Sequence, residues 1–153
     1  MNFPFEFVSE SVDNTEMLGK TLACIIADDD TLPRFVAMYG DLGVGKTAFV
    51  RGFCSTICPN SIVKSPTFAL VNEYKCHANE LGVKKVCHFD MYRVTDEDDL
   101  YSIGYDDYLR HDNICIAEWC ELIEYALPNE RIEVRIEKTD DVNKRRITIN
   151  LVL

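Results

Sequence analysis

The stretch that decides the fold is Phe35-Val36-Ala37-Met38-Tyr39-Gly40-Asp41-Leu42-Gly43-Val44-Gly45-Lys46-Thr47. Its first five residues form an apolar run, which is typical of a buried strand. The next eight match the pattern G-x-x-x-x-G-K-[ST], in which glycines let the backbone form a concave nest of N–H groups that faces a phosphate. A helical stretch, 48–57, follows. The segment therefore predicts a strand, a phosphate-binding loop and a helix, with a nucleoside triphosphate as the ligand.

Each part of this loop has an expected contact. Lys46 can reach the β- and γ-phosphates, and Thr47 can place its hydroxyl on Mg²⁺ at the start of a helix whose dipole favours anions. The expected nucleotide-binding residues are Asp41, Leu42, Gly43, Val44, Gly45, Lys46 and Thr47. The alternative is a glycine-rich turn without a ligand, and the strand and helix on either side of the loop weigh against it.

Length and composition favour one domain, residues 1–153, because a chain of 153 residues that is 47% hydrophobic can bury a core of its own. No stretch approaches the roughly 18 apolar residues of a membrane span. The first six residues lack a basic region followed by an apolar core, so we expect a cytoplasmic protein that does not contact membranes.

Seven cysteines are an odd number, and most of them lie in apolar runs without a C-x-x-C pair. We therefore expect free, buried thiols. A zinc cluster is the alternative, because some cysteines stand four residues apart on the expected helix and others adjoin histidines. The residues concerned are Cys54, Cys58, Cys76-His77 and Cys87-His88.

The formal net charge of −10 argues against a broad nucleic-acid-binding face, because such a face needs clustered basic residues. Acidic residues crowd between positions 96 and 112, whereas basic residues near the C-terminus alternate with acids. Two interpretations stay open for these charges: a solvated face with salt-bridged strands, or a docking surface for a basic partner or for RNA.

The remaining pattern places further elements along the chain. Apolar alternation predicts strands at 3–8, 68–74, 85–89, 113–117, 131–138 and 145–153. Helical spacing predicts a helix that Ser11 or Asp13 caps, ending before the acids at 28–30, and further helices at 95–103 and 121–126. We expect 3–8 to be an edge strand because of Pro4, 68–74 and 85–89 to form a hairpin with a turn around 79–82, and the last two strands to pair antiparallel.

These elements predict a three-layer α/β fold of the P-loop NTPase type, with a mixed sheet that carries antiparallel additions. Strands alternate with helices, and the phosphate loop follows the C-terminal end of a strand. In open α/β sheets, ligands bind in the crevice at that edge. We therefore expect the site at the carboxyl ends of the parallel strands.

Three further clusters follow the phosphate loop in order. They are Ser65-Pro66-Thr67-Phe68, His88-Phe89-Asp90-Met91-Tyr92-Arg93 and Ile116-Ala117-Glu118-Trp119-Cys120-Glu121. Together with the loop, they closely resemble the TsaE (YjeE) family, the ATPases of bacterial tRNA threonylcarbamoyladenosine (t6A) synthesis. The resemblance spans about 11–121. It departs at Ala117, where the family usually has isoleucine, which should loosen the packing but keep the neighbouring glutamate.

The resemblance implies roles for four side chains. It implies that Thr47 and Glu118 hold Mg²⁺, that Asp90 has a catalytic part, and that Thr67 is a switch residue which senses the γ-phosphate. With Lys46, the expected catalytic set is Asp90, Lys46 and Thr67. The alternatives are a surface acid at Glu118, a structural Asp90 that pairs with Arg93, and an ordinary turn residue at Thr67.

Further residues are less strongly indicated. Trp119 can lie near the nucleotide because of its place after the strand, and a core position is the alternative. The resemblance implies that Thr15 contacts the nucleotide base, with an ordinary helix surface residue as the alternative. The same choice between core and ligand applies to His88 and Tyr92. For Arg93, we favour ion pairs with nearby acids over a role as an internal arginine finger.

The resemblance implies an Mg²⁺-dependent ATPase that supports t6A formation by driving or resetting a partner complex. Its implied partners are the threonylcarbamoyl-transferase subunit and its companion paralogue, with tRNA contacted only through the complex. Hydrolysis should be weak without them. A small-molecule or nucleotide kinase is the alternative, although the acidic segment between Val94 and Asn113 does not suit an arginine-rich lid. A third possibility is an assembly module that nucleotide binding alone switches. The absence of an N-K-x-D pattern mildly favours ATP over GTP.

Overall fold

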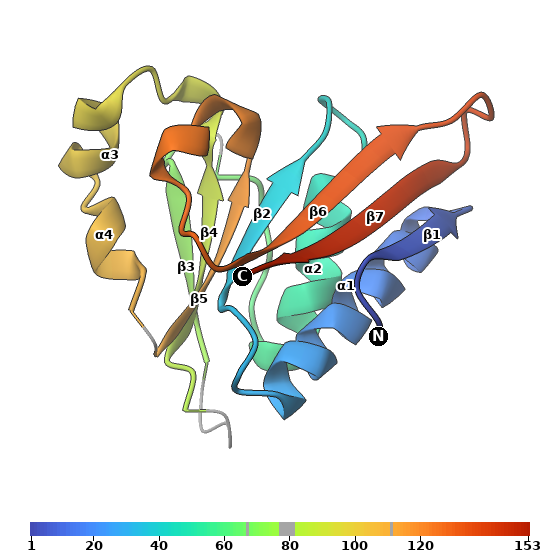
Figure 1. The fold of residues 1–153 in the computed structure, drawn as a ribbon, viewed down its shortest axis with the longest axis horizontal. Helices are drawn as coiled ribbons and strands as arrows, with labels where there is room; N and C mark the ends of the chain where they lie inside the picture. Colours follow the sequence, from blue (N-terminus) through green and yellow to red (C-terminus); the bar gives the residue numbers. More distant parts are fainter. Residues whose placement is uncertain (67, 77–81, 111) are drawn as a thin grey trace.

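A mixed sheet forms the centre of the molecule (Figure 1). The computed structural model describes residues 1–66, 68–76, 82–110 and 112–153. Within them, the strands are β1 (Phe5–Ser9), β2 (Phe35–Tyr39), β3 (Val71–Lys75), β4 (Lys85–Asp90), β5 (Asn113–Glu118), β6 (Arg131–Lys138) and β7 (Arg145–Val152). The helices are α1 (Val12–Asp28), α2 (Lys46–Ile57), α3 (Glu97–Ser102) and α4 (Tyr105–Tyr108), with 3-10 turns η1 (Met91–Arg93), η2 (Cys120–Leu122) and η3 (Glu124–Ala126).

The strand order is β1-β7-β6-β2-β5-β4-β3. Strand β2 lies parallel to both β5 and β6, and β4 lies parallel to β5. Strands β3, β7 and β1 join antiparallel. The expected mixed sheet with antiparallel additions, the edge position of β1 and the terminal antiparallel pair are thus confirmed. The β3–β4 pairing is also confirmed, while most of the predicted turn, 79–81, lies outside the described residues.

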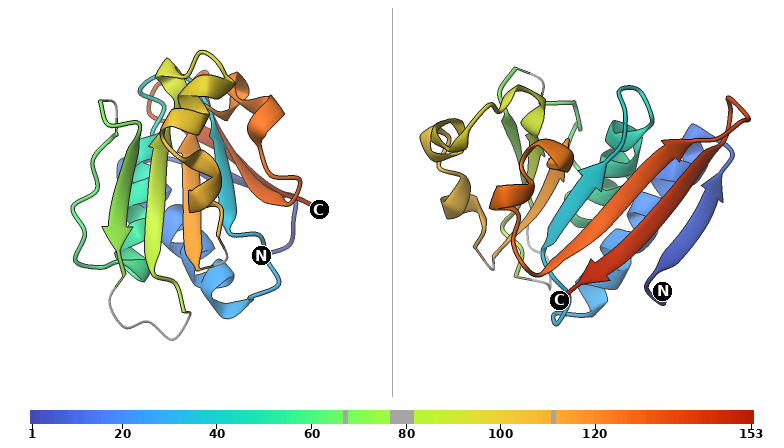
Figure 2. Two further views of the ribbon diagram at one scale, coloured as in Figure 1. Left: turned by 90° about the vertical axis from the view of Figure 1, so that its left-hand side faces the viewer. Right: turned by 45° about the horizontal axis from the view of Figure 1, so that its top comes forward.

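Helices cover the two faces of the sheet unequally (Figure 2). Helices α1 and α2 pack on one face, where their apolar side chains share a core with residues from β2, β4, β5, β6 and β7. The short elements between β4 and β6 pack on the opposite face, where their core includes residues of β2, β4 and β5. The third layer therefore covers only that part of the sheet, and the second face of β6, β7 and β1 is open.

Two glycines bring α1 and α2 into close contact. A Cβ atom on Gly19 would lie 2.1 Å from the carbonyl oxygen of Phe49, and one on Gly52 would lie 1.9 Å from that of Glu16. Any side chain at these positions would force the helix backbones apart. The start of α1 is set by Ser11, whose hydroxyl accepts a hydrogen bond from the backbone N–H of Asn14 at 3.1 Å.

Several predicted elements differ from the structure. Strand β3 begins at Val71 and not at position 68, because a turn precedes it in which Leu70 adopts φ +63° and donates its N–H to the carbonyl of Pro66. The expected helix at 95–103 is divided, since Gly104 with φ +70° starts the separate helix α4. The expected helix at 121–126 is a pair of 3-10 turns. Helix α1 extends through Asp28.

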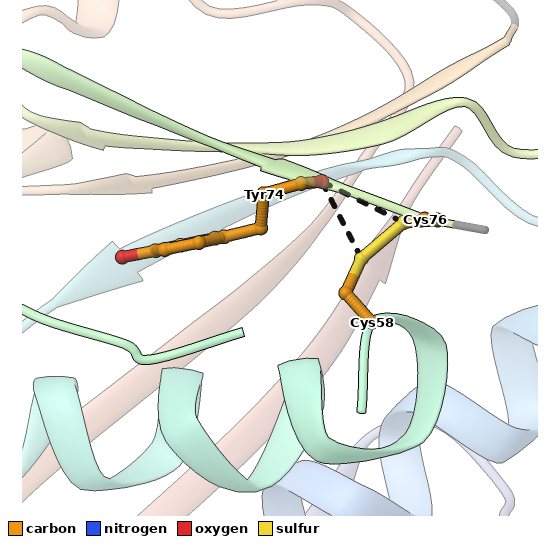
Figure 3. The surroundings of a disulfide bond; sticks show 3 residues. All are labelled: Cys58, Tyr74 and Cys76. Atoms are coloured by element: carbon orange, nitrogen blue, oxygen red, sulfur yellow. Dashed lines mark hydrogen bonds between the residues drawn. A yellow bond between two sulfur atoms is a disulfide. The ribbon is translucent and has the colours of Figure 1, made fainter. Parts of the chain in front are cut away.

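The cysteine prediction was wrong in part. Cys58 follows α2, Cys76 follows β3, and a disulfide bond joins them with a Cα–Cα distance of 4.7 Å (Figure 3). Their sulfur atoms lie 3.5 and 3.7 Å from the carbonyl oxygen of Tyr74. The two cysteines are 18 residues apart in sequence, and only the packing of α2 against the end of β3 brings them together. The free cysteines are Cys54, Cys87, Cys115 and Cys120, which are buried, and Cys24, which is exposed.

None of the helices described has the length and apolar character that crossing a bilayer requires.

Candidate functional site

The phosphate-loop sequence lies between β2 and α2, where the sequence predicts it. Three of its glycines adopt positive φ angles: 140° at Gly40, 71° at Gly43 and 119° at Gly45. Gly45 is also the N-cap of α2. A side chain would be strained in these conformations, and this explains the glycines at this spacing. Leu42 is 81% exposed, whereas Val44 is buried and anchors the loop to the core.

Residues of the strands β6 and β7 contact this loop. A Cβ atom on Gly40 would lie 2.4 Å from the carbonyl oxygen of Ile136 on β6, so the backbones are in close contact there. From β7, Arg145 donates an Nε hydrogen bond to the carbonyl of Val44 at 3.2 Å. The terminal antiparallel pair thus contributes to the position of the loop, although it lies about a hundred residues further along the chain.

Lys46 begins α2 and is buried, with only 5% of its surface exposed. Its Nζ donates hydrogen bonds to the carbonyl oxygens of Gly40 and of Asp41, the latter at 3.0 Å, and lies 4.0 Å from the ring centroid of Trp119. Burial lowers the pKa of Lys46, and nearby carboxylates, with Glu118 the strongest, oppose this shift. The ammonium group therefore lies between the loop and the ends of the parallel strands.

Asp90 and Glu118 end two adjacent parallel strands. Their Cα atoms are partners in the β4–β5 register, and their exposed fractions are 6% and 4%. In the β2–β5 register, the partner of Glu118 is Met38, which belongs to the core on the α2 side of the sheet. Register partners point to the same face, so Glu118 and Asp90 also point toward α2. Asp90 Oδ1 accepts a hydrogen bond from the N–H of Tyr92 at 3.0 Å, which caps the turn η1. The structure thus places two buried carboxylates near Lys46, and a surface acid at position 118 is excluded.

His88 adds a contact that the sequence analysis did not predict. Its side chain is fully buried, and its Nε2 lies 2.7 Å from Oε1 of Glu118. The sequence contained a signal for it: His88 precedes Asp90 by two residues, so both point to the same face of β4.

Trp119 and Tyr92 form an aromatic pair beside Lys46. The centroids of the two rings are 4.9 Å apart. Trp119 is half-buried and adopts φ +64°, a left-handed conformation at the end of β5. Tyr92 is exposed, and so a core position is excluded for it. Trp119 packs against the core and contacts the lysine of the loop, while its place beside a nucleotide stays a prediction.

In this region one prediction was wrong and one alternative is excluded. Among the residues that the structure describes, Arg93 forms no ion pair with Asp90 or another acid, and its guanidinium lies 5.1 Å from the ring centroid of Phe68. The alternative that Thr15 is a surface residue is excluded, since it is 3% exposed and its hydroxyl lies 2.7 Å from that of Ser9, while its contact with a nucleotide base stays a prediction. Thr67, the predicted switch residue, lies outside the described residues.

Comparison with known proteins shows the family. The profile of the family described as threonylcarbamoyl adenosine biosynthesis protein TsaE matches residues 9–147. The chain belongs to the TsaE family. The match includes the phosphate loop and the buried residues at the ends of β4 and β5.

Individual members of the TsaE family are similar over most of the chain. The tRNA threonylcarbamoyladenosine biosynthesis protein TsaE of Bacillus subtilis (strain 168) is 36% identical over 140 residues, covering 92% of this chain and 81% of that protein. The Haemophilus influenzae protein of the same name is 42% identical over 106 residues, covering 69% of this chain and 64% of that protein. The crystal structure of Bacillus subtilis YdiB matches with a TM-score of 0.77 and 29% identity, covering 100% of this chain and 88% of that one.

Magnesium and zinc make different demands on the ligands that a protein supplies. Among the residues described, no group of three or more His, Cys, Asp or Glu side chains is arranged to hold a metal ion. The zinc alternative also loses Cys58 and Cys76 to the disulfide bond. Mg²⁺ commonly takes one or two protein oxygens and completes its shell with phosphate and water. The hydroxyl of Thr47 in the first turn of α2 and the carboxylate of Glu118 fit that requirement.

The acidic segment of the chain is largely a solvated face. Asp96 caps α3 through the N–H of Asp99 at 3.1 Å, and hydrogen bonds from Thr95 lower the pKa of Asp99. Arg110 pairs with Asp107 at 3.0 Å. A groove of about 900 Å³ runs between α3, α4 and η3, away from the phosphate loop. Whether a basic partner docks there stays a prediction.

Proposed function

We propose that this chain is an Mg²⁺-dependent ATPase that supports t6A formation in tRNA, and that residues 1–153 form a single domain with the P-loop NTPase fold. The observation that carries the proposal is the meeting of buried Lys46 with buried Asp90 and Glu118 beside a loop of left-handed glycines. Burying these charges is costly unless each has a charged or hydrogen-bonding partner, and a magnesium-complexed triphosphate supplies both signs.

The loop binds the polyphosphate through its backbone. The N–H groups of residues 41–47 face the phosphates, and the N-terminus of α2 favours their negative charge. Lys46 now donates to two neutral carbonyl oxygens, those of Gly40 and Asp41. Phosphate oxygens are stronger acceptors because they are charged, so Lys46 exchanges its partners when ATP binds. We place Trp119 and Thr15 next to the nucleotide, since Trp119 contacts Lys46 and Thr15 lies beside Gly45.

Thr47 and Glu118 hold Mg²⁺ in this proposal. When bound, the ion neutralises charge on the phosphate oxygens. Glu118 is suited to this part because it is buried and His88 already orients one of its oxygens. Asp90 then remains as the carboxylate that orients the attacking water or accepts its proton. Thr67 follows Pro66 and completes the catalytic set as the residue that senses the γ-phosphate.

We propose the threonylcarbamoyl-transferase subunit and its companion paralogue as the partners, with hydrolysis driving or resetting their complex. The net charge of −10 supports indirect contact with tRNA, since direct binding would need a basic track. Turnover is weak in the isolated chain and faster in the complex. A cytoplasmic location also stays a prediction.

Steady-state ATP hydrolysis, measured alone and across a titration with both partners, tests this function. We expect turnover to rise with partner concentration, and we expect Lys46→Ala to remove both the activity and the heat of ADP binding in calorimetry. Asp90→Asn should keep ADP binding and lose hydrolysis. Unchanged turnover across the whole titration contradicts the proposed role. Transfer of phosphate to a nucleoside or sugar in the same assay would instead support the kinase alternative.

A further inference from the structure

His88 and Glu118 face each other across two parallel strands. His88 is the register partner of Ile116, and Asp90 is the partner of Glu118. Since side chains alternate between the faces of a strand, His88, Asp90 and Glu118 all point to the face that α2 covers. His88 lies two residues before Asp90, so its ring reaches diagonally toward the carboxylate on the next strand. The result is the 2.7 Å contact between Nε2 and Oε1.

Burial makes this contact specific. The exposed fractions of His88 and Glu118 are 0% and 4%, and among the residues described His88 is the only side chain that hydrogen-bonds the Glu118 carboxylate. An ionised carboxylate only accepts hydrogen bonds, so Nε2 is the donor of this contact when Glu118 is ionised. The other ring nitrogen, Nδ1, is buried without a partner within the described part of the chain. The polar interaction of the ring is therefore directed at Glu118 alone.

A contact of this kind leaves one carboxylate oxygen available. Oε1 accepts from His88, and Oε2 does not take part in that bond. The ring of His88 is fully buried, and its centroid lies 6.3 Å from that of the Tyr74 ring. Carboxylates that bind metals are commonly oriented by a second hydrogen-bonded group, and loss of that group weakens metal binding.

We propose that His88 is a positioning residue that orients Glu118 for Mg²⁺ in the nucleotide complex, an inference that rests on the function proposed above. A buried histidine–glutamate pair can instead serve only the stability of the core. The two roles differ in one respect: a positioning residue changes the magnesium dependence of nucleotide binding, whereas a core residue changes only the unfolding transition.

Three variants separate these roles. His88→Gln keeps an N–H donor near the position of Nε2, while the shorter side chain of His88→Asn cannot reach Glu118. Ile116→Val is the matched control, because Ile116 is fully buried, is the register partner of His88 and points to the same face. For each variant, calorimetry measures the affinity for ADP in EDTA and across a Mg²⁺ titration, and thermal melting measures stability.

For His88→Asn, we expect ADP affinity in EDTA to change less than about twofold and the Mg²⁺ concentration for half-maximal enhancement to rise about tenfold or more. His88→Gln should restore most of this loss, and Ile116→Val should leave the Mg²⁺ dependence unchanged. Equal behaviour of the Gln and Asn variants, or a lower melting temperature with an unchanged Mg²⁺ response, overturns the proposal. If the Asn variant does not fold, His88→Met, which fills a similar volume without an N–H donor, takes its place: a Mg²⁺ response about tenfold weaker than the parent's supports the proposal, and one near the parent's overturns it.

Measurements on the parent protein distinguish failure of the proposed function from failure of the proposed role of His88. If it binds no ADP under any condition, the proposed function fails. If it binds ADP and Mg²⁺ has no effect on the affinity, nucleotide binding by this chain is supported and the role of His88 is rejected. Only a magnesium-dependent parent with a magnesium-defective Asn variant supports both.

Discussion

The sheet has two halves of three strands each that differ in their cover, and β3 is the edge strand beside one of them. Strands β2, β5 and β4 form the doubly covered half, which is packed between α1–α2 on one face and the short helices and turns on the other. Strands β6, β7 and β1 form the singly covered half, whose second face is open to solvent (Figure 2). All residues of β2 and β5 are buried, whereas burial alternates along β6.

This difference explains where the candidate site lies. His88, Asp90 and Glu118 all belong to the doubly covered half and are nearly inaccessible to water. Electrostatic and hydrogen-bonding interactions are stronger in such dry surroundings. The singly covered half has many charged residues, but they are solvated, and it acts as a support for the phosphate loop through Ile136 and Arg145. One half of the sheet thus provides a site from which solvent is excluded, and the other half, which is exposed to solvent on one face, supports the loop.

The largest expected effect comes from comparing the same substitution, glutamate to glutamine, at one position in each half of the sheet. Glu118→Gln should lower ATP turnover by about 10²–10³-fold, because the substitution removes a buried negative charge that helps to stabilise the transition state in the proposed mechanism. Glu6→Gln is the control, since Glu6 is an exposed residue of β1, and its turnover should stay within about twofold of the parent, as surface changes usually have little effect. Phosphate release at saturating ATP gives both values. Comparable losses in the two variants would remove the functional distinction between the halves.

In the singly covered half, substitution of a buried residue should lower the stability of the fold and leave nucleotide binding unchanged. Ile147 on β7 is fully buried, and Ile147→Ala should lower the free energy of unfolding by about 2–4 kcal/mol. The affinity for ADP should not change well below the melting temperature. Arg146→Ala, at the adjacent position on the open face, should change stability by less than about 0.5 kcal/mol. Urea unfolding tests both, and a large effect of Arg146→Ala would show that the open face is not a simple solvated surface.

The contact between α1 and α2 tests the helical layer that both halves of the sheet share. Gly52→Ala places a Cβ atom against the carbonyl of Glu16, and it should cost about 1–3 kcal/mol because the backbones cannot separate without loss of packing. Lys20→Ala, an exposed change on α1, should cost less than about 0.5 kcal/mol. Chemical denaturation measures the difference. A neutral Gly52→Ala variant would mean that the two helices move apart easily.

The smallest effect concerns Tyr105 in the outer cover of the doubly covered half. Its ring packs edge-on against Phe35 and Phe89, and its buried hydroxyl has no hydrogen-bond partner in the described part of the chain. Tyr105→Phe should therefore be neutral or stabilise the fold by up to about 1 kcal/mol at pH 7.

The pH dependence of the same variant has a definite sign. Burial raises the pKa of Tyr105, so above about pH 10 the unfolded chain ionises this tyrosine while the folded protein keeps it neutral. The stability that this difference represents is present below about pH 10 and is lost as the pH rises further. Tyr105→Phe should thus lose less stability than the parent between about pH 9.5 and 11 in urea unfolding. Parallel curves for the two proteins would show that Tyr105 titrates normally.

Local sequence determined much of the candidate site. The phosphate loop, the cap at Ser11 and the burial of the strands at 35–39 and 113–118 follow from short-range patterns, because glycine conformation, capping and apolar runs depend on neighbouring residues. The position of Asp90 and Glu118 at strand ends was predicted for the same reason. Resemblance to the TsaE family then narrowed the function further than the loop could.

Only the tertiary structure decided which distant residues meet. The contact of His88 with Glu118 depends on the β4–β5 register, the disulfide of Cys58 with Cys76 on the packing of α2 against β3, and the support of Val44 by Arg145 on the return of β7 to the loop. Sequence patterns show which face a residue occupies, but not which strand lies beside it or in what register. That choice depends on packing across the whole sheet, since a shift of one residue in any pairing would exchange its two faces.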